Sequence, residues 1–167
     1  MNIMEKSTLL NLYFKNVIKL YFSFVIFLGL FISTQAQNRK LDKSTFTIIK
    51  YSFNEWIPFD SVKGATLTDK EIDNMEPLIT AAVNENNRNQ KSKGFKLFTL
   101  HNYRRQYIAV INRKGEKVVW VNFFCDSNNL EWRKEVIVVE DGGNCYFNLK
   151  INLSTKAVYE LFVNGYA

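Results

Sequence analysis

A strand–turn–strand pattern in the second half of the chain constrains the fold most, because it fixes how residues pair. Two stretches rich in β-branched and aromatic residues, 103–112 and 116–125, flank the turn sequence Asn-Arg-Lys-Gly at 112–115. Asn at the first position and Gly at the last favour a type I turn closed by a left-handed glycine. This turn predicts an antiparallel hairpin in which Val110 lies opposite Val118.

The same register divides the hairpin into two faces. The expected core face holds Tyr107, Ala109, Ile111, Val119, Val121, Phe123 and Cys125. The other face holds Gln106, Ile108, Val110, Val118, Trp120, Asn122 and Phe124. The first set is the more uniformly apolar, so we expect it to be buried.

A second hairpin is predicted around Asp-Gly-Gly-Asn at 141–144, where both glycines can adopt positive φ. Its strands are residues 133–140 and 145–153, and the latter alternates cleanly between apolar and polar side chains. Residues 157–164 could be helix or strand. We favour a closing strand, because only Phe162 departs from the alternation.

The first half predicts one strand and one helix. Residues 46–53 have strand composition, and the connector 54–65 carries large apolar groups that we expect to press onto the core. Thr68 and Glu71 form a capping box, which starts a helix over about residues 69–86. Pro77 is expected to kink or restart that helix, and residues 86–96 are expected to be a loop.

The predicted fold is α+β, with one N-terminal helix packed on a four- to five-stranded antiparallel meander sheet. This order of elements resembles the cystatin-like architecture. Inhibitory cystatins use a Gln-x-Val-x-Gly loop and a Pro-Trp loop, which are lacking at the corresponding residues 112–116 and 126–132. The resemblance therefore implies an arrangement of elements and not protease inhibition.

From Tyr103 onward the chain also resembles an uncharacterised group of small exported bacterial proteins. The matching segments are 105–108, 112–120, 141–148 and 163–167. This resemblance implies export, and it implies no particular activity.

The first 36 residues have the pattern of a secretory signal peptide. Lysines precede an apolar run from Leu20 to Ile32, and Thr-Gln-Ala at 34–36 offers a cleavage site. At about 1.5 Å per residue the run spans about 20 Å, short of a hydrocarbon core of about 30 Å. We therefore expect a single exported domain, residues 37–167, that is periplasmic or extracellular and has no stable membrane insertion after cleavage.

Charge excludes one class of partner. Removing the leader removes three lysines and Glu5, which lowers the net charge from +6 to +4. That value is ordinary for a soluble domain, so no nucleic-acid partner is expected.

The two cysteines present a choice. Export favours a disulfide. The predicted strand 133–140, however, would place Cys125 and Cys145 at opposite ends of the sheet, beyond the reach of a bridge. The meander order therefore predicts two free, buried thiols.

Residues for catalysis or metal binding are scarce. His101 is the single histidine and is expected at a strand entry, so a nucleophile would lack its usual base. One histidine and two separated cysteines match no zinc site. We expect no enzyme activity and no cofactor, and an enzyme with a dispersed carboxylate site is the least favoured alternative.

The remaining candidate is a surface. If the helix covers one side of the sheet, the other side is open and offers aromatic and amide groups to a protein or glycan partner. The residues on that face are Gln106, Trp120, Asn122, Tyr146, Asn148 and Lys150. Two alternatives stay open: the connector at Trp56, Pro58 and Phe59 covers this face, or the chain assembles through it as a structural or envelope-associated subunit.

Overall fold

The computed structural model describes residues 15–19, 41–52, 59, 61–125 and 131–166. The chain divides into two compact units, Met1–Arg39 and Lys40–Ala167. In the first unit, residues 15–19 are helical. Among the described residues, no helix combines the length and hydropathy that a membrane span requires.

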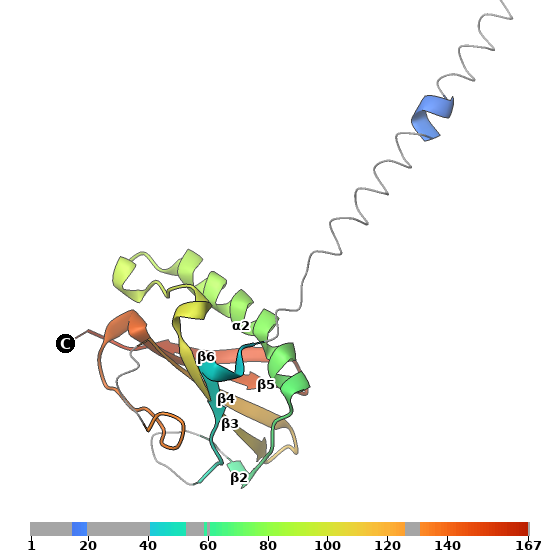
Figure 1. Cartoon of the computed structure of the whole chain (residues 1–167). Helices are drawn as coiled ribbons and strands as arrows, with labels where there is room; N and C mark the ends of the chain where they lie inside the picture. Colours follow the sequence, from blue (N-terminus) through green and yellow to red (C-terminus); the bar gives the residue numbers. More distant parts are fainter. Residues whose placement is uncertain (1–14, 20–40, 53–58, 60, 126–130, 167) are drawn as a thin grey trace, which may run out of the picture. The chain divides into compact units, whose positions relative to one another are not determined.

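The second unit is an α+β fold whose described residues form a mixed six-stranded sheet (Figure 1). The strand order is β1-β3-β4-β5-β6, and β2 pairs with β3 beside β1. The strands are β1 (Phe46–Ile48), β2 (Ser61–Gly64), β3 (Arg104–Asn112), β4 (Lys117–Phe124), β5 (Tyr146–Asn152) and β6 (Ala157–Val163). Because β1 runs parallel to β3, the predicted all-antiparallel sheet is wrong at this edge.

The hairpin of β3 and β4 forms in the predicted register. Val110 pairs with Val118, and Gly115 has a φ of 78°. The Asn112 side-chain oxygen accepts hydrogen bonds from the backbone N–H groups of Lys114 and Glu116, each 2.9 Å long. This local polar chemistry explains why the turn could be predicted from sequence.

Residues 133–140 are not a strand, which corrects the predicted meander. β5 pairs directly with β4, with Phe124 opposite Tyr146. The segment 131–141, here named the strap, instead lies across the sheet without pairing as a strand. Its backbone carbonyls accept hydrogen bonds from the side chains of Gln106 in β3, Asn122 in β4 and Asn164 after β6. The turn at 142–143 has the predicted positive φ at both glycines.

The direct pairing of β4 and β5 also reverses the prediction for the cysteines. Cys125 and Cys145 form a disulfide, with Cα atoms 5.1 Å apart. Their backbones are bonded as well, since Cys125 N–H donates to the Cys145 carbonyl at 3.0 Å. The free-thiol prediction was wrong because it placed a strand between two strands that are neighbours.

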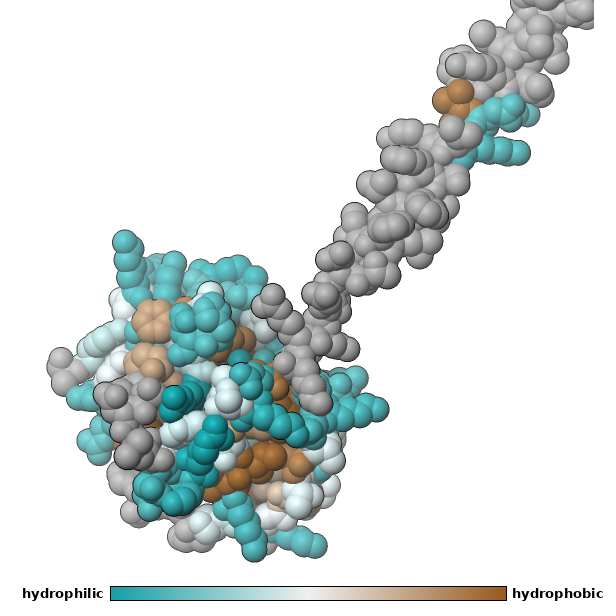
Figure 2. All heavy atoms as spheres, in the orientation of Figure 1, coloured by the Kyte–Doolittle hydropathy of each residue, from teal (hydrophilic) through white to brown (hydrophobic). Residues whose placement is uncertain are grey.

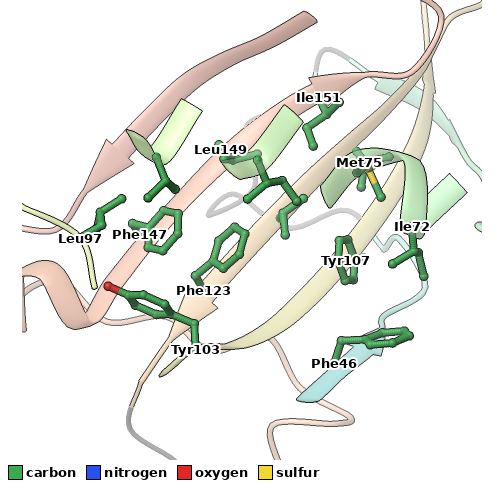
Figure 3. Packing of buried hydrophobic residues seen from close by; sticks show 14 of the residues in the cluster. Phe46, Ile72, Met75, Leu97, Tyr103, Tyr107, Phe123, Phe147, Leu149 and Ile151 are labelled. Atoms are coloured by element: carbon green, nitrogen blue, oxygen red, sulfur yellow. The ribbon is translucent and has the colours of Figure 1, made fainter. Parts of the chain in front are cut away.

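The main helix, α2 (Asp69–Asn89), begins at the predicted capping box of Thr68 and Glu71. It runs through Pro77 without a break and ends three residues later than expected, at Asn89. Its buried stripe packs on the inner face of the sheet, together with rings from β3, β4 and β5 (Figure 3). The buried stripe is Ile72, Met75, Ile79 and Val83.

Aromatic packing fills the rest of this core. The rings of Phe123 and Phe147 stack with centroids 4.1 Å apart, and Tyr103 meets Phe147 edge-on at 5.0 Å. The Tyr103 hydroxyl donates to the Asn144 carbonyl at 2.6 Å, so a buried polar group is satisfied at the end of the core. Over β3, β4 and β5 the inner face of the sheet is closed, so a surface site on these strands lies on the outer face, away from α2.

Candidate functional site

The predicted open face is largely covered. Gln106 is fully buried, and Trp120, Asn122 and Lys150 are 5%, 7% and 8% exposed. Tyr146 and Asn148 are half-buried. The prediction of an open face is therefore wrong for Gln106, Trp120, Asn122 and Lys150, because the strap and Phe59 of the connector cover this part of the face.

Two side-chain amides hold the strap against the outer face. Gln106 donates from its side-chain nitrogen to the carbonyls of Trp132 and Glu135, each at 2.6 Å, and accepts from the Ile137 N–H at 2.9 Å. Asn122 donates to the Ile137 carbonyl at 2.8 Å. These side-chain amides bond backbone groups of the strap that would otherwise pair with a neighbouring strand. Gln106 and Asn122 therefore stabilise the fold and are not available to a partner.

Apolar contacts cover the neighbouring part of the face. Ile108 and Trp120 form a cluster with Phe59 of the connector and Val136 of the strap, together with Ile49 and Tyr51. The alternative in which the connector covers this face is confirmed at Phe59; Trp56 and Pro58 lie outside the described residues. The Trp120 indole N–H donates to the Asn148 side-chain oxygen at 3.2 Å, which leaves the ring no free polar group.

Trp132 anchors the start of the strap. Trp132 is 5% exposed, and the guanidinium carbons of Arg104 and Arg133 lie 5.1 Å and 4.2 Å from its ring centroid. Arg133 also donates to the carbonyls of Ser44 and Phe46, which ties the strap to β1. This role of Trp132 was not predicted, although a tryptophan followed by arginine is a usable signal for cation–π packing.

The part of the outer face that stays accessible is at β5 and β6. Tyr159 is 38% exposed and Phe162 is 61% exposed. They lie opposite Lys150 and Asn148, respectively, so they share the outer face with them. We name this set, with Tyr146, the β5–β6 surface; Figure 2 shows that hydrophobic residues reach the surface of the molecule in patches between hydrophilic ones.

A bulge explains why Phe162 departs from the alternation of its strand. The register shifts between Asn148 and Lys150, where Glu160 has a φ of 53°. One extra residue in β6 changes which side chains face outward, so that Tyr159 and Phe162 both do. The break in the sequence pattern was therefore the signal of the bulge.

Lys150 is held in place on this surface. Its ammonium group bonds the Glu160 carboxylate at 2.5 Å and lies 5.7 Å from the centroid of the Phe59 ring. Its charge is thus compensated, and the surface that a partner meets is aromatic and amide-rich.

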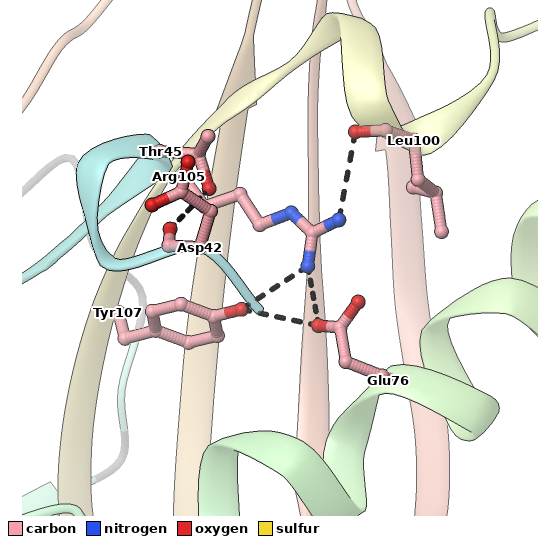
Figure 4. A network of polar contacts seen from close by, with 6 residues as sticks. All are labelled: Asp42, Thr45, Glu76, Leu100, Arg105 and Tyr107. Carbon is pink, nitrogen blue, oxygen red and sulfur yellow. Dashed lines mark hydrogen bonds and ion pairs between the residues drawn. The ribbon is translucent and has the colours of Figure 1, made fainter. Parts of the chain in front are cut away.

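A buried polar cluster lies on the other side of the sheet, under α2 (Figure 4). Arg105 is 2% exposed and forms an ion pair with Glu76. The Tyr107 hydroxyl lies 3.4 Å from both groups. Burial raises the pKa of Tyr107 above its ordinary value, so its hydroxyl is neutral at physiological pH. The pair joins helix to sheet, and the carboxylate balances the guanidinium charge.

The described carboxylates show no arrangement that points to acid–base or metal chemistry. Among described residues, no group of three or more His, Cys, Asp or Glu could hold a metal ion. Burial alone raises the pKa of Glu71, but hydrogen bonds from Lys117 and Thr68 lower it more, so that its pKa lies below the ordinary value. His101 is exposed in a short 3-10 turn, Leu100–Asn102, as expected for a position at a strand entry.

Comparisons with protein-family models, with curated proteins and with solved structures found no match to this chain.

Proposed function

We propose that this chain is a small exported, non-catalytic binding protein that contacts its partner through the β5–β6 surface. The observation that carries the proposal is the exposure of Phe162 and Tyr159 on a strand of a rigid sheet. Two large rings exposed on one face of a rigid sheet offer an apolar contact surface, and flat rings give contact area at low entropic cost.

Export is supported by two independent features. Residues 1–36 carry the signal-peptide pattern, and the disulfide joins Cys125 to Cys145. Disulfides persist in oxidising compartments such as the periplasm and the extracellular medium and are rare in the cytosol. A partner is therefore expected in the envelope or outside the cell.

The cystatin-like order remains part of the proposal. In its favour, α2 precedes four consecutive antiparallel strands, β3 to β6. The parallel strand β1 and the strap depart from it. Because fold does not determine function, the proposed binding rests on Phe162 and its neighbours and not on this likeness.

A protein partner is favoured over a glycan by the composition of the surface. Exposed aromatic rings beside amide and half-buried groups are typical of protein interfaces. Lys150, the cation on this surface, is already paired with Glu160, which leaves little net charge to attract an acidic polysaccharide.

The test is a quantitative capture experiment. The exported chain is immobilised and exposed to envelope and medium fractions of its source cell, and retained proteins are compared by mass spectrometry with those retained by Phe162→Ala. Phe98→Ala is the matched control, because Phe98 is also an exposed ring (42%) but belongs to the segment between α2 and β3.

We expect one protein that saturates on the wild-type chain and on Phe98→Ala and is reduced at least about tenfold on Phe162→Ala. Equal retention by all three chains contradicts the surface assignment. Release of the bound material by soluble glycans, with no protein retained, contradicts the partner class.

A further inference from the structure

The outer edge of β6 is a strand edge that the described fold leaves unpaired. β6 is the last strand in the sheet order, and its ladder bonds go to β5. Alternate residues of such a strand direct their backbone N–H and C=O groups away from the sheet. At the opposite edge, the short strands β1 and β2 both pair with β3, and Arg133 of the strap donates to the Phe46 carbonyl of β1.

Burial shows that this edge is open on both faces. The inward residues Val158, Leu161 and Val163 pack against the core but are only half-buried. Their neighbours on β5, Leu149 and Ile151, are fully buried. A further strand beside β6 would complete the burial of these side chains, and it would also cover part of Tyr159.

The residues of β6 are self-complementary about Val158. Ala157 and Tyr159, which flank it, both lie on the outer face, opposite Asn152 and Lys150. In an antiparallel pair of two β6 strands centred on Val158, each Tyr159 lies opposite the small Ala157 of the other chain. A large ring opposite a small side chain is a favourable cross-strand pair.

Charge gives the same register. Lys156 and Glu160 bracket this segment, and their positive φ values, 57° and 53°, limit the extended pairing to residues 157–159. Centring on Val158 puts Lys156 of one chain across from Glu160 of the other, twice by symmetry, so that opposite charges meet at each end of the paired segment. Glu160 bonds Lys150 through one carboxylate oxygen, and its second oxygen can accept from Lys156.

We propose that a second copy of this chain pairs with the first along β6, as an antiparallel two-fold dimer centred on Val158. This inference goes beyond the proposed function, because it concerns the strand edge. Phe162 lies four residues from the centre and stays available to another protein. The dimer also differs from the predicted assembly through the outer face, which the strap covers in part.

The test exchanges the two charges in separate chains, produced from the full sequence in an exporting host. Lys156→Glu places Glu opposite Glu, and Glu160→Lys places Lys opposite Lys. Each single variant should dimerise roughly tenfold more weakly than wild type. In an equimolar mixture of the two variants every cross-chain pair is again opposite in charge, so the mixture should regain the wild-type dimer affinity.

Sedimentation velocity over a concentration series provides the readout, and circular dichroism confirms that each variant is folded. Lys156→Gln serves as the neutral control and should weaken the dimer less than Lys156→Glu. If Glu160→Lys does not fold, the dimer affinities of wild type, Lys156→Gln and Lys156→Glu decide the question without it. The dimer affinity of wild type should then depend more strongly on salt concentration than that of Lys156→Gln.

Three results overturn the dimer: wild-type chain that is still monomeric at about 1 mM, single variants that dimerise as tightly as wild type, or a mixture no tighter than its components. Failure of the dimer and failure of the proposed function are distinguishable. Capture of the partner by wild type and Phe162→Ala tests the proposed function alone. Sedimentation of the Lys156 and Glu160 variants tests the dimer alone, and Phe162→Ala should still dimerise whichever result the capture experiment gives.

Discussion

The side-chain nitrogen of Asn122 donates a hydrogen bond to the side-chain oxygen of Gln106, 3.1 Å away, across the pairing of β4 with β3. The two amides together bind the backbone of the strap, which has no strand partner of its own. By holding the strap in place, this pair keeps the outer face covered over β3 and β4, while the β5–β6 surface stays accessible.

Replacing Gln106 by Leu should destabilise the fold by about 3 kcal/mol, because three backbone groups of the strap, one of them buried, lose their partner. Urea unfolding measures the loss, and hydrogen exchange should show faster exchange at Ile137. Asn74→Leu, on the exposed side of α2, is the control and should change stability by less than about 0.5 kcal/mol. Equal stability of wild type and Gln106→Leu contradicts the role of the amide.

The disulfide should be present in the exported protein. Its intact mass should be about 2 Da below that of the reduced chain, and a proteolytic digest should contain a peptide linking Cys125 to Cys145. Replacing both cysteines by Ser should lower the free energy of unfolding by about 3 kcal/mol, since the bond closes a loop across a sequence separation of 20 residues. Two free thiols in the native exported protein would contradict the disulfide.

Removing one partner of the buried ion pair should cost more than removing both. Glu76→Gln leaves the Arg105 guanidinium buried without its carboxylate and should destabilise by about 3 kcal/mol. The double variant Glu76→Gln/Arg105→Met should be more stable than Glu76→Gln alone. Thermal or urea unfolding of the singles and the double measures the coupling; additive losses show that the two groups do not interact.

Alkaline pH should destabilise the fold through Tyr103. Burial raises the pKa of Tyr103 to about 12, although a hydrogen bond from the Phe98 N–H lowers it in part. Since the unfolded side chain ionises near pH 10, the unfolded state loses its proton first. Stability is then fully present below pH 10 and falls as pH rises from about 10 to about 12.

Tyr103→Phe should reduce this slope, because it removes the titrating group. It should also lower stability at neutral pH by about 1 kcal/mol, through loss of the hydrogen bond to the Asn144 carbonyl. Urea unfolding at a series of pH values gives both numbers. An unchanged alkaline slope in Tyr103→Phe would mean that other groups control it.

Elements with local signals were predictable from the sequence. The Asn112 side chain bonds its own turn, and the Thr68 and Glu71 side chains bond the first turn of α2, so the residues needed are within a few positions of one another. The inner face followed from alternation, with Tyr107, Val121 and Phe147 all fully buried.

The strap could not be predicted, because distant side chains determine it. Residues 136–139 are Val-Ile-Val-Val, a strand composition by any local criterion. Their backbone groups instead form hydrogen bonds with the side-chain amide of Gln106, about thirty residues earlier, and with those of Asn122 and Asn164. The error at the strap then produced the errors for the cysteines and for the open face.

The candidate site was predicted in part. Tyr146, Asn148 and Lys150 do lie on the outer face, but Tyr159 and Phe162, its most exposed rings, were missed. They reach that face only because of the bulge at Glu160, and a bulge depends on pairing with β5 that the sequence of β6 alone does not specify.

Hydroxyl-radical footprinting of the exported protein tests whether the strap covers the outer face over β3 and β4 and leaves β6 accessible. We expect strong labelling of Phe162 and Tyr159 and weak labelling of Trp120 and Trp132, which are each 5% exposed. Strong labelling of Trp120 in the folded protein, at a rate near that of the urea-unfolded chain, would contradict this coverage.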